Sequence, residues 1–167
     1  HGVAPNEEQY HAAMKELGID KKTIKDGLLK VKWPGRFEIF IRNPLVILDG
    51  AHNEDSSLKL VENLKSISNK EDVCFLTSIL EDKDIGKILK NFSSVADKIV
   101  YTSLKDYHRG LGAKEMYDRD IYFDNRKYYE NMVEAYNEAK KSKIVVVAGS
   151  FYLLCEFRRV IESENRL

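Results

Sequence analysis

The chain has 167 residues, a length that suggests one domain or one domain with an appendage. Lys and Arg number 27, as do Asp and Glu, so the formal net charge is zero, which argues against a basic nucleic-acid-binding domain. Hydrophobic residues make up 43% and charged residues 32%, which argues against a disordered chain, and apolar runs of only a few residues exclude a transmembrane helix.

The first 35 residues do not share the pattern of the rest. Segments 6–18 and 24–29 have helical spacing of apolar residues, and a Trp-Pro-Gly turn then precedes a predicted strand at 37–41. We interpret residues 1–30 as the end of a preceding domain and residues 31–167 as a domain of their own. Because the chain begins with His1 and not with Met, we expect it to be a fragment or a processed product.

From residue 45 onward, short apolar runs alternate with segments of helical periodicity. The predicted strands are 45–48, 73–77, 99–101, 121–123 and 144–148. The predicted helices are 54–66, 82–91, 113–117, a segment with Tyr129, Met132, Val133 and Tyr136 on one face, and 150–162. This alternation predicts an α/β fold, in which a mostly parallel sheet has helices on both faces and right-handed crossovers.

Ligands of open α/β sheets bind beyond the carboxyl ends of the strands, and Asp49 and His52 follow the strand 45–48 at once. Gly50 between them allows a tight turn. A carboxylate here can hold ribose hydroxyls or a metal-bound ligand, and an imidazole can contact an anion, act as a base or orient a neighbour. The alternative is that Asp49 caps the next helix and that His52 is a surface loop residue.

Three further positions could contact an anion. Ser150 follows the strand 144–148 and is placed to cap the last helix, whose N-terminal N–H groups could bind a carboxylate or phosphate; an ordinary cap is the alternative. Arg36, beside a rigid Pro-Gly turn, could present a fixed fork to phosphate, although most surface arginines are merely solvated. Arg109 lies in a loop that reaches the same edge of the sheet. The charged cluster 81–84 is interpreted as the solvated start of a helix.

Several common motifs are missing from the chain. It contains no GxxxxGK[ST] phosphate loop, GxGxxG dinucleotide fingerprint, HExxH motif, GxSxG elbow or EF-hand loop, so a self-sufficient ATPase or dehydrogenase is not supported. Cys74 and Cys155 lie in apolar stretches outside any CxxC pair, as is typical of buried, reduced thiols. We therefore expect no metal site in this chain. With no secretory leader visible, we also expect a cytoplasmic location.

Taken together, the motifs form an ordered series that resembles the C-terminal part of folylpolyglutamate synthase. In many bacteria this enzyme doubles as dihydrofolate synthase, and it belongs to the muramyl-peptide ligase superfamily. The resemblance covers nearly the whole chain, and WPGR and DGAHN are its most specific elements. The series comprises WPGRFE (33–38), PLVIL (44–48), DGAHN (49–53), Lys83-Asp84 and GSFYL (149–153).

The resemblance implies a Rossmann-like sheet without a dinucleotide fingerprint, in a ligase that joins L-glutamate to folate or dihydropteroate. The carboxylate would be activated by ATP as an acyl phosphate, with Mg²⁺ neutralising charge on the phosphates. An N-terminal domain of the same enzyme would carry the phosphate loop, the Mg²⁺ site and most of the folate site. The present chain would close over ATP, contribute to the glutamate site and be inactive alone. The resemblance also suggests a monomer, with no nucleic-acid or membrane partner.

The resemblance assigns roles to four residues, and a fifth, Arg109, lies in a loop that departs from the family pattern. Arg36 and Asp49 would bind the nucleotide. His52 would act near the incoming glutamate as a catalytic and binding residue, Ser150 would bind a glutamate carboxylate, and Arg109 would assist. Two other functions stay open. One is a ligase of the same superfamily with another amino acid, and the other is a stand-alone module that binds a nucleotide or an amino acid without catalysis.

Overall fold

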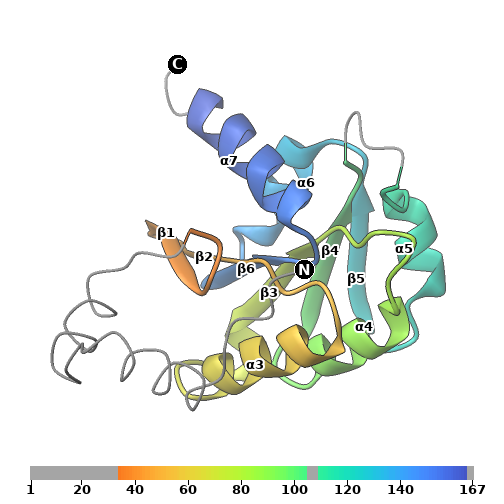
Figure 1. The fold of residues 1–167 in the computed structure, drawn as a ribbon. Helices are drawn as coiled ribbons and strands as arrows, with labels where there is room; N and C mark the ends of the chain where they lie inside the picture. Colours follow the sequence, from red (N-terminus) through yellow and green to blue (C-terminus); the bar gives the residue numbers. More distant parts are fainter. Residues whose placement is uncertain (1–33, 105–108, 165–167) are drawn as a thin grey trace, which may run out of the picture. The chain divides into compact units, whose positions relative to one another are not determined.

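The computed structural model describes residues 34–104 and 109–164, and these form one six-stranded sheet flanked by helices (Figure 1). The expectations for residues 1–30, for the boundary near residue 30 and for Trp33 lie outside the described residues. The strands are β1 (Glu38–Arg42), β2 (Leu45–Asp49), β3 (Val73–Thr77), β4 (Lys98–Thr102), β5 (Asn125–Tyr129) and β6 (Ile144–Ala148). The helices are α3 (Glu54–Lys65), α4 (Ile85–Ser93), α5 (Ala113–Arg119), α6 (Met132–Ala139) and α7 (Phe151–Glu164), with a short 3₁₀ turn, η1 (Lys70–Asp72).

The strand order is β1-β2-β6-β3-β4-β5, and all neighbouring pairs are parallel except β1 with β2, which is antiparallel. Each of the five parallel strands is followed by a helix. The predicted α/β fold with a mostly parallel sheet is therefore confirmed. The last parallel strand in the sequence, β6, lies between β2 and β3, so the chain returns to the middle of the sheet after it has formed the edge strand β5.

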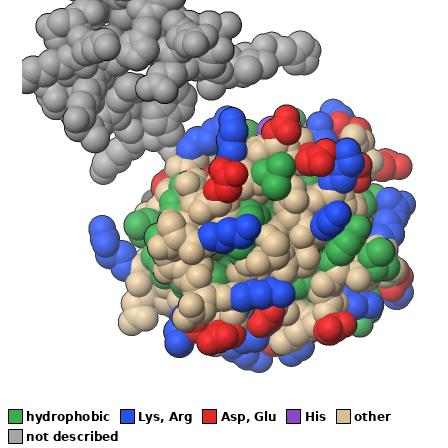
Figure 2. Space-filling view, turned by 90° about the horizontal axis from the view of Figure 1, so that it is seen from below, with side chains coloured by type: hydrophobic (Ala, Val, Ile, Leu, Met, Phe, Trp, Pro, Cys, Tyr) green, Lys and Arg blue, Asp and Glu red, His purple; other side chains and the backbone are tan. Residues whose placement is uncertain are grey.

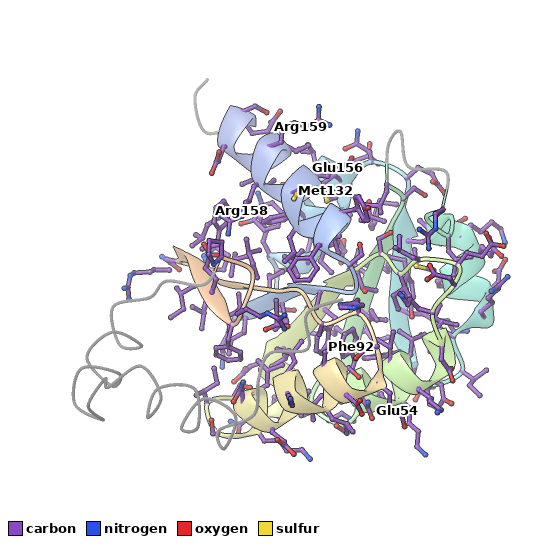
Figure 3. All side chains as sticks on the ribbon, in the orientation of Figure 1. Glu54, Phe92, Met132, Glu156, Arg158 and Arg159 are labelled. Atoms are coloured by element: carbon purple, nitrogen blue, oxygen red, sulfur yellow. The ribbon has the colours of Figure 1, made fainter. Side chains whose placement is uncertain are left out.

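Helices cover both faces of the sheet. One core contains residues of α3, α4 and α5, and the other contains residues of α6 and α7 (Figure 1). Along β3 the side chains alternate between these cores, because Phe75 belongs to the first and Leu76 to the second. The Phe75 ring stacks on that of Phe92 at a centroid distance of 3.9 Å. Phe92 lies on α4 (Figure 3). Within the described ranges, no helix combines the length and the apolar character needed to cross a membrane.

The strand expected at 121–123 is wrong. These residues form a loop in which the Asp120 carboxylate accepts the Tyr122 and Phe123 N–H groups, and the strand is β5, which begins at Asn125. Tyr129 therefore lies in β5 and not on the face of α6. The physical reason is that β5 is an edge strand without a fully buried residue, so its polar sequence lacks the apolar signal of a strand.

Two smaller expectations also need correction. The second helix begins at Ile85 and not at residue 82, because Asp84 is its N-cap and accepts the Lys87 N–H at 3.2 Å. Of the two cysteines, Cys74 is buried as expected, but Cys155 on α7 is exposed. On the side of the molecule that α3 and α4 cover, basic and acidic side chains are interspersed over the described surface, in line with the balanced charge (Figure 2).

Glu138 connects α6 to β5 through an ion-pair network. Its carboxylate binds Lys127 of β5 at 2.8 Å and Lys141 at 2.7 Å, and its side chain is only 17% exposed. The hydrogen bonds from these two lysines, aided by their charges and opposed by burial, lower the pKa of Glu138 from 4.5 to about 2.

Glu138→Gln is expected to lower the free energy of unfolding by about 1–2 kcal/mol at pH 7, after allowance for solvent screening. Because folding depresses this pKa, the contribution is complete above about pH 4.5 and is lost as the pH falls towards about 2. Denaturant unfolding of both proteins at a series of pH values measures the difference. Glu62→Gln is the control, since Glu62 is exposed on α3 and has no ion pair among the described residues. A difference that is the same at every pH would contradict this account.

Candidate functional site

The carboxyl ends of β2, β6 and β3 lie side by side, and the chain leaves them towards opposite faces. From β2 and β3 it continues into α3 and α4 on one face, whereas from β6 it continues into α7 on the other (Figure 1). Where neighbouring strands connect to opposite faces, a crevice opens beyond their ends, and α/β proteins bind ligands there. Asp49 is the last residue of β2, and His52 and Ser150 follow the ends of β2 and β6.

Asp49 joins two loops at this edge. Its Oδ2 accepts the Phe37 N–H at 2.8 Å, and its Oδ1 accepts the Ala51 N–H at 2.8 Å. The residue is 9% exposed, and burial raises the pKa of the carboxyl group above its ordinary value, although both hydrogen bonds and the charge of Arg36 oppose this. Each carboxylate oxygen keeps a further acceptor position, so the geometry leaves Asp49 able to accept from a ligand as well.

The alternative in which Asp49 caps the following helix is wrong. Asn53 is the N-cap of α3, and its side-chain oxygen accepts the Ser56 N–H at 2.9 Å in a capping box. His52 lies in the loop before α3 and is half-buried, with its ring 5.9 Å from that of Phe151.

The imidazole of His52 has a defined tautomer. Its Nδ1 lies 2.8 Å from the Gly50 carbonyl oxygen. A carbonyl oxygen can only accept, so Nδ1 carries the hydrogen, and in the neutral ring Nε2 has an available lone pair. The ring is therefore oriented by the backbone turn at Gly50 and can accept a proton at Nε2.

Gly149 allows the loop after β6 to approach the loop after β2. Its N–H donates to the Ala51 carbonyl oxygen at 2.9 Å, and its φ is +130°, a value that L side chains rarely adopt. A Cβ here would lie 2.5 Å from Thr77 Oγ1 and 2.7 Å from the Ser78 carbonyl oxygen. Glycine is thus required by both backbone conformation and space.

Ser150 caps α7, as expected from its position. Its Oγ accepts the Leu153 N–H at 3.1 Å, and the residue is 1% exposed. The first turn of α7 consequently points its N–H groups into the edge at which the strands end, where they could bind an anion. Ser150 can therefore cap α7 while the N-terminus of that helix takes part in a ligand site.

A pocket of about 220 Å³ brings three of the predicted residues together. Its lining residues are His52, Leu80, Asp82, Lys83, Arg109, Ser150, Phe151 and Tyr152. Arg109 binds Asp82 at 2.9 Å, and Lys83 binds Asp82 at 3.0 Å. The hydrogen bond from Lys83, together with the charge of Arg109, holds the pKa of Asp82 below its ordinary value. The pocket thus combines two cations, one carboxylate, an imidazole and a helix N-terminus.

Arg36 does not line this pocket, but it contacts one of the residues that do. Its exposed guanidinium lies 5.7 Å from the centroid of the Phe151 ring. The same ring lies against Gly50 so closely that a Cβ there would overlap it. Phe151 therefore contacts both the pocket and the loops outside it. These loops carry Arg36 and Asp49.

Sequence reasoning did not assign the other five lining residues of the pocket, which include Leu80, to the site. Asp82 and Lys83 were assigned to a solvated helix start, although Lys83 belonged to the series of motifs. Phe151 and Tyr152 follow Ser150 directly and are 42% and 50% exposed, which is unusual for aromatic residues next to a buried strand. Their position directly after Ser150, a predicted site residue, was the signal in the sequence that could have identified them.

Two other features bear on the choice of site. A cavity of about 240 Å³ lies at the opposite, amino-terminal edge of the sheet. Two of the lysines that line this cavity already pair with Glu138, and none of its lining residues is a predicted site residue. In the part of the chain that the structure describes, no three His, Cys, Asp or Glu side chains converge as a metal site would require. These residues do not by themselves fit a Mg²⁺ site.

Comparison with known proteins gives consistent results. Residues 35–151 match the family described as "Mur ligase, glutamate ligase domain". Dihydrofolate synthase/folylpolyglutamate synthase of Bacillus subtilis is 33% identical over 145 residues, which are 84% of this chain and 33% of that protein. The chain therefore spans about a third of the length of this curated relative.

Two solved structures are similar over most of the chain. Escherichia coli FolC in complex with ADP aligns with a TM-score of 0.83 and 27% identity, covering 99% of this chain and 41% of that one. The bifunctional folylpolyglutamate synthase/dihydrofolate synthase of Yersinia pestis, with Mn, AMPPNP and L-glutamate bound, aligns with a TM-score of 0.74 and 26% identity, covering 86% and 35%.

Gly149→Ala is expected to lower the free energy of unfolding by about 2–4 kcal/mol, because a Cβ at this φ is strained and collides with Thr77 and Ser78. Thermal or denaturant unfolding measures the loss. Gly112→Ala is the matched control, since a Cβ at Gly112 meets nothing within 4 Å. Equal stability of the two variants would contradict the steric role assigned to Gly149.

Proposed function

The chain belongs to the Mur ligase, glutamate ligase domain family, and on that premise we propose that residues 31–167 form the C-terminal domain of an ATP-dependent ligase that adds L-glutamate to folate or dihydropteroate. The relatives of similar sequence and structure carry these activities in their names, and this chain corresponds to about a third of the first of them. The rest of the reaction site belongs to an N-terminal domain of the same enzyme.

One observation carries the proposal, namely the pocket at the carboxyl edge that His52, Ser150, Lys83 and Arg109 line together. Free glutamate has two carboxylates and one ammonium group. Lys83, Arg109 and the N-terminus of α7 supply positive charge and N–H donors for carboxylates. Asp82 and His52 supply acceptors for the amino group. The composition of this pocket therefore suits glutamate better than a purely anionic or apolar ligand.

The nucleotide is assigned to the neighbouring loops. Arg36 presents its guanidinium beside Phe151, in a position to pair with phosphate oxygens of ATP. Asp49 keeps acceptor positions for a ribose hydroxyl in addition to its two backbone hydrogen bonds. The two groups of residues meet at Phe151, which places a nucleotide next to the glutamate pocket.

His52 is assigned the proton transfer of the second chemical step. In the proposed reaction, ATP phosphorylates the folate carboxylate, and the glutamate amine attacks the resulting acyl phosphate. The carbon–nitrogen bond forms, the carbon–oxygen bond to phosphate breaks, and the amine loses a proton. Nε2 of His52 can accept that proton, because Nδ1 is held by the Gly50 carbonyl oxygen. Closure of the two domains excludes water that would hydrolyse the acyl phosphate.

Mg²⁺ has no cluster of ligands among the described residues of this chain, so it is assigned to the N-terminal domain. When bound there, it would neutralise charge on the phosphates of ATP. The residues of this chain contribute binding, orientation and proton transfer.

Lys83→Met, measured in the complete enzyme, is expected to raise KM for glutamate about ten- to a hundredfold, because a charge-assisted hydrogen bond to a carboxylate is lost. KM for ATP should stay within about twofold, and Ser150→Ala should show the same selectivity with a smaller effect. Steady-state kinetics with each substrate varied in turn measures both constants. Lys90→Met on the exposed side of α4 is the control. An equal rise in both KM values would remove Lys83 from the glutamate site.

Arg36→Ala is expected to have the opposite selectivity. KM for ATP should rise about tenfold or more, because a guanidinium contact with phosphate is lost, while KM for glutamate changes little. The control is Arg42→Ala on β1, which is exposed and has no ion pair among the described residues. An unchanged KM for ATP in the Arg36 variant would contradict the nucleotide assignment.

A further inference from the structure

The turn that carries Arg36 is held mainly by three hydrogen bonds to its neighbours. The carbonyl oxygen of Gly35 accepts the Gly50 N–H at 2.7 Å. The Phe37 N–H donates to Oδ2 of Asp49 at 2.8 Å. The third bond runs from the Gly35 N–H to Glu38 Oε2 at 2.7 Å. The position of Arg36 thus depends on groups that hold the residues on either side of it.

The backbone of this turn is strained. Gly35 has a φ of +72°, and Phe37, which is not a glycine, has a φ of +44°. A left-handed conformation is disfavoured for a non-glycine residue, so it persists only where surrounding contacts enforce it. The three hydrogen bonds provide that enforcement.

Glu38 is itself held by Arg158 of α7, 120 residues later in the sequence. Arg158 Nη2 donates to Glu38 Oε2, the same oxygen that accepts the Gly35 N–H. Arg158 is labelled on α7 in Figure 3. Both side chains are about one quarter exposed, at 28% and 27%, and the guanidinium also lies 5.1 Å from the Phe40 ring centroid. Partial burial raises the pKa of Glu38, but the hydrogen bonds from Arg158 and Gly35 outweigh this and lower it. Glu38 is therefore ionised at neutral pH.

Helix α7 consequently holds the Arg36 turn at two places. Phe151, in its first turn, lies beside the Arg36 guanidinium, and Arg158, about two turns further on, holds Glu38. We propose that Glu38 and Arg158 are positioning residues of the nucleotide site, which fix the turn at 34–37 so that Arg36 is presented beside Phe151 for phosphate. This inference rests on the proposed function of Arg36, and neither residue of the pair touches a substrate.

Steady-state kinetics of the complete enzyme tests the pair. Glu38→Gln keeps an acceptor for the Gly35 N–H but loses the charge, and Arg158→Met loses the partner. Each is expected to raise KM for ATP about tenfold, with kcat and KM for glutamate within about twofold, and the double variant should be no worse than either single variant. Arg158→Lys should restore part of the affinity. Asp72→Asn breaks the ion pair that Asp72 forms with Lys143 at the opposite edge of the sheet and should leave KM for ATP unchanged.

A second measurement separates this inference from the proposed function. Hydrogen exchange of the Gly35 and Phe37 amides should be faster in Glu38→Gln than in the parent enzyme. Unchanged exchange, or effects of the two single substitutions on KM that simply add, overturns the inference. Faster exchange with an unchanged KM for ATP in Glu38→Gln also overturns it, provided that Arg36→Ala raises that KM. If Arg36→Ala leaves KM for ATP unchanged, the nucleotide assignment fails and this inference fails with it.

Discussion

The close approach of two loops, one after β2 and one after β6, is the constraint on which the site depends. The Gly149 N–H binds the Ala51 carbonyl oxygen, and the Gly50 N–H binds the Gly35 carbonyl oxygen, so three segments distant in sequence are joined by backbone hydrogen bonds. Side chains at Gly149 or Gly50 would occupy space that Thr77, Ser78 and the Phe151 ring already fill. Because backbone groups make these links, the arrangement depends more on glycine than on any catalytic side chain.

Asp49 illustrates how a residue with a structural role can also be suited to the proposed chemistry. Its carboxylate braces the loops that carry Phe37 and Ala51, and it is buried for that reason. A group held in this way presents its remaining lone pairs in a fixed direction, which is what recognition of a hydroxyl requires. A structural role for Asp49 therefore supports the proposed nucleotide role and does not compete with it.

Helix α7 connects the parts of the site. Its first turn is capped by Ser150 and carries Phe151, which touches both the Arg36 turn and the pocket, and its middle carries Arg158. The buried face of the helix packs in the second core through Leu153, Leu154 and Phe157. The hydrophobic contacts anchor the helix, and its exposed first turn can then act as a rigid wall of the proposed glutamate pocket.

The sequence by itself determined the α/β class, the buried strands 73–77 and 144–148, and the positions of Asp49, His52 and Ser150 at strand ends. These features depend on local apolar runs and on residues adjacent to them, so they are readable along the chain. The tertiary structure alone decided the limits of β5, whose edge position removes the apolar pattern, and the partners of each site residue. Asp82 meets Arg109, and Glu38 meets Arg158, because strand order and crossovers bring distant segments together, and no local pattern encodes such pairs.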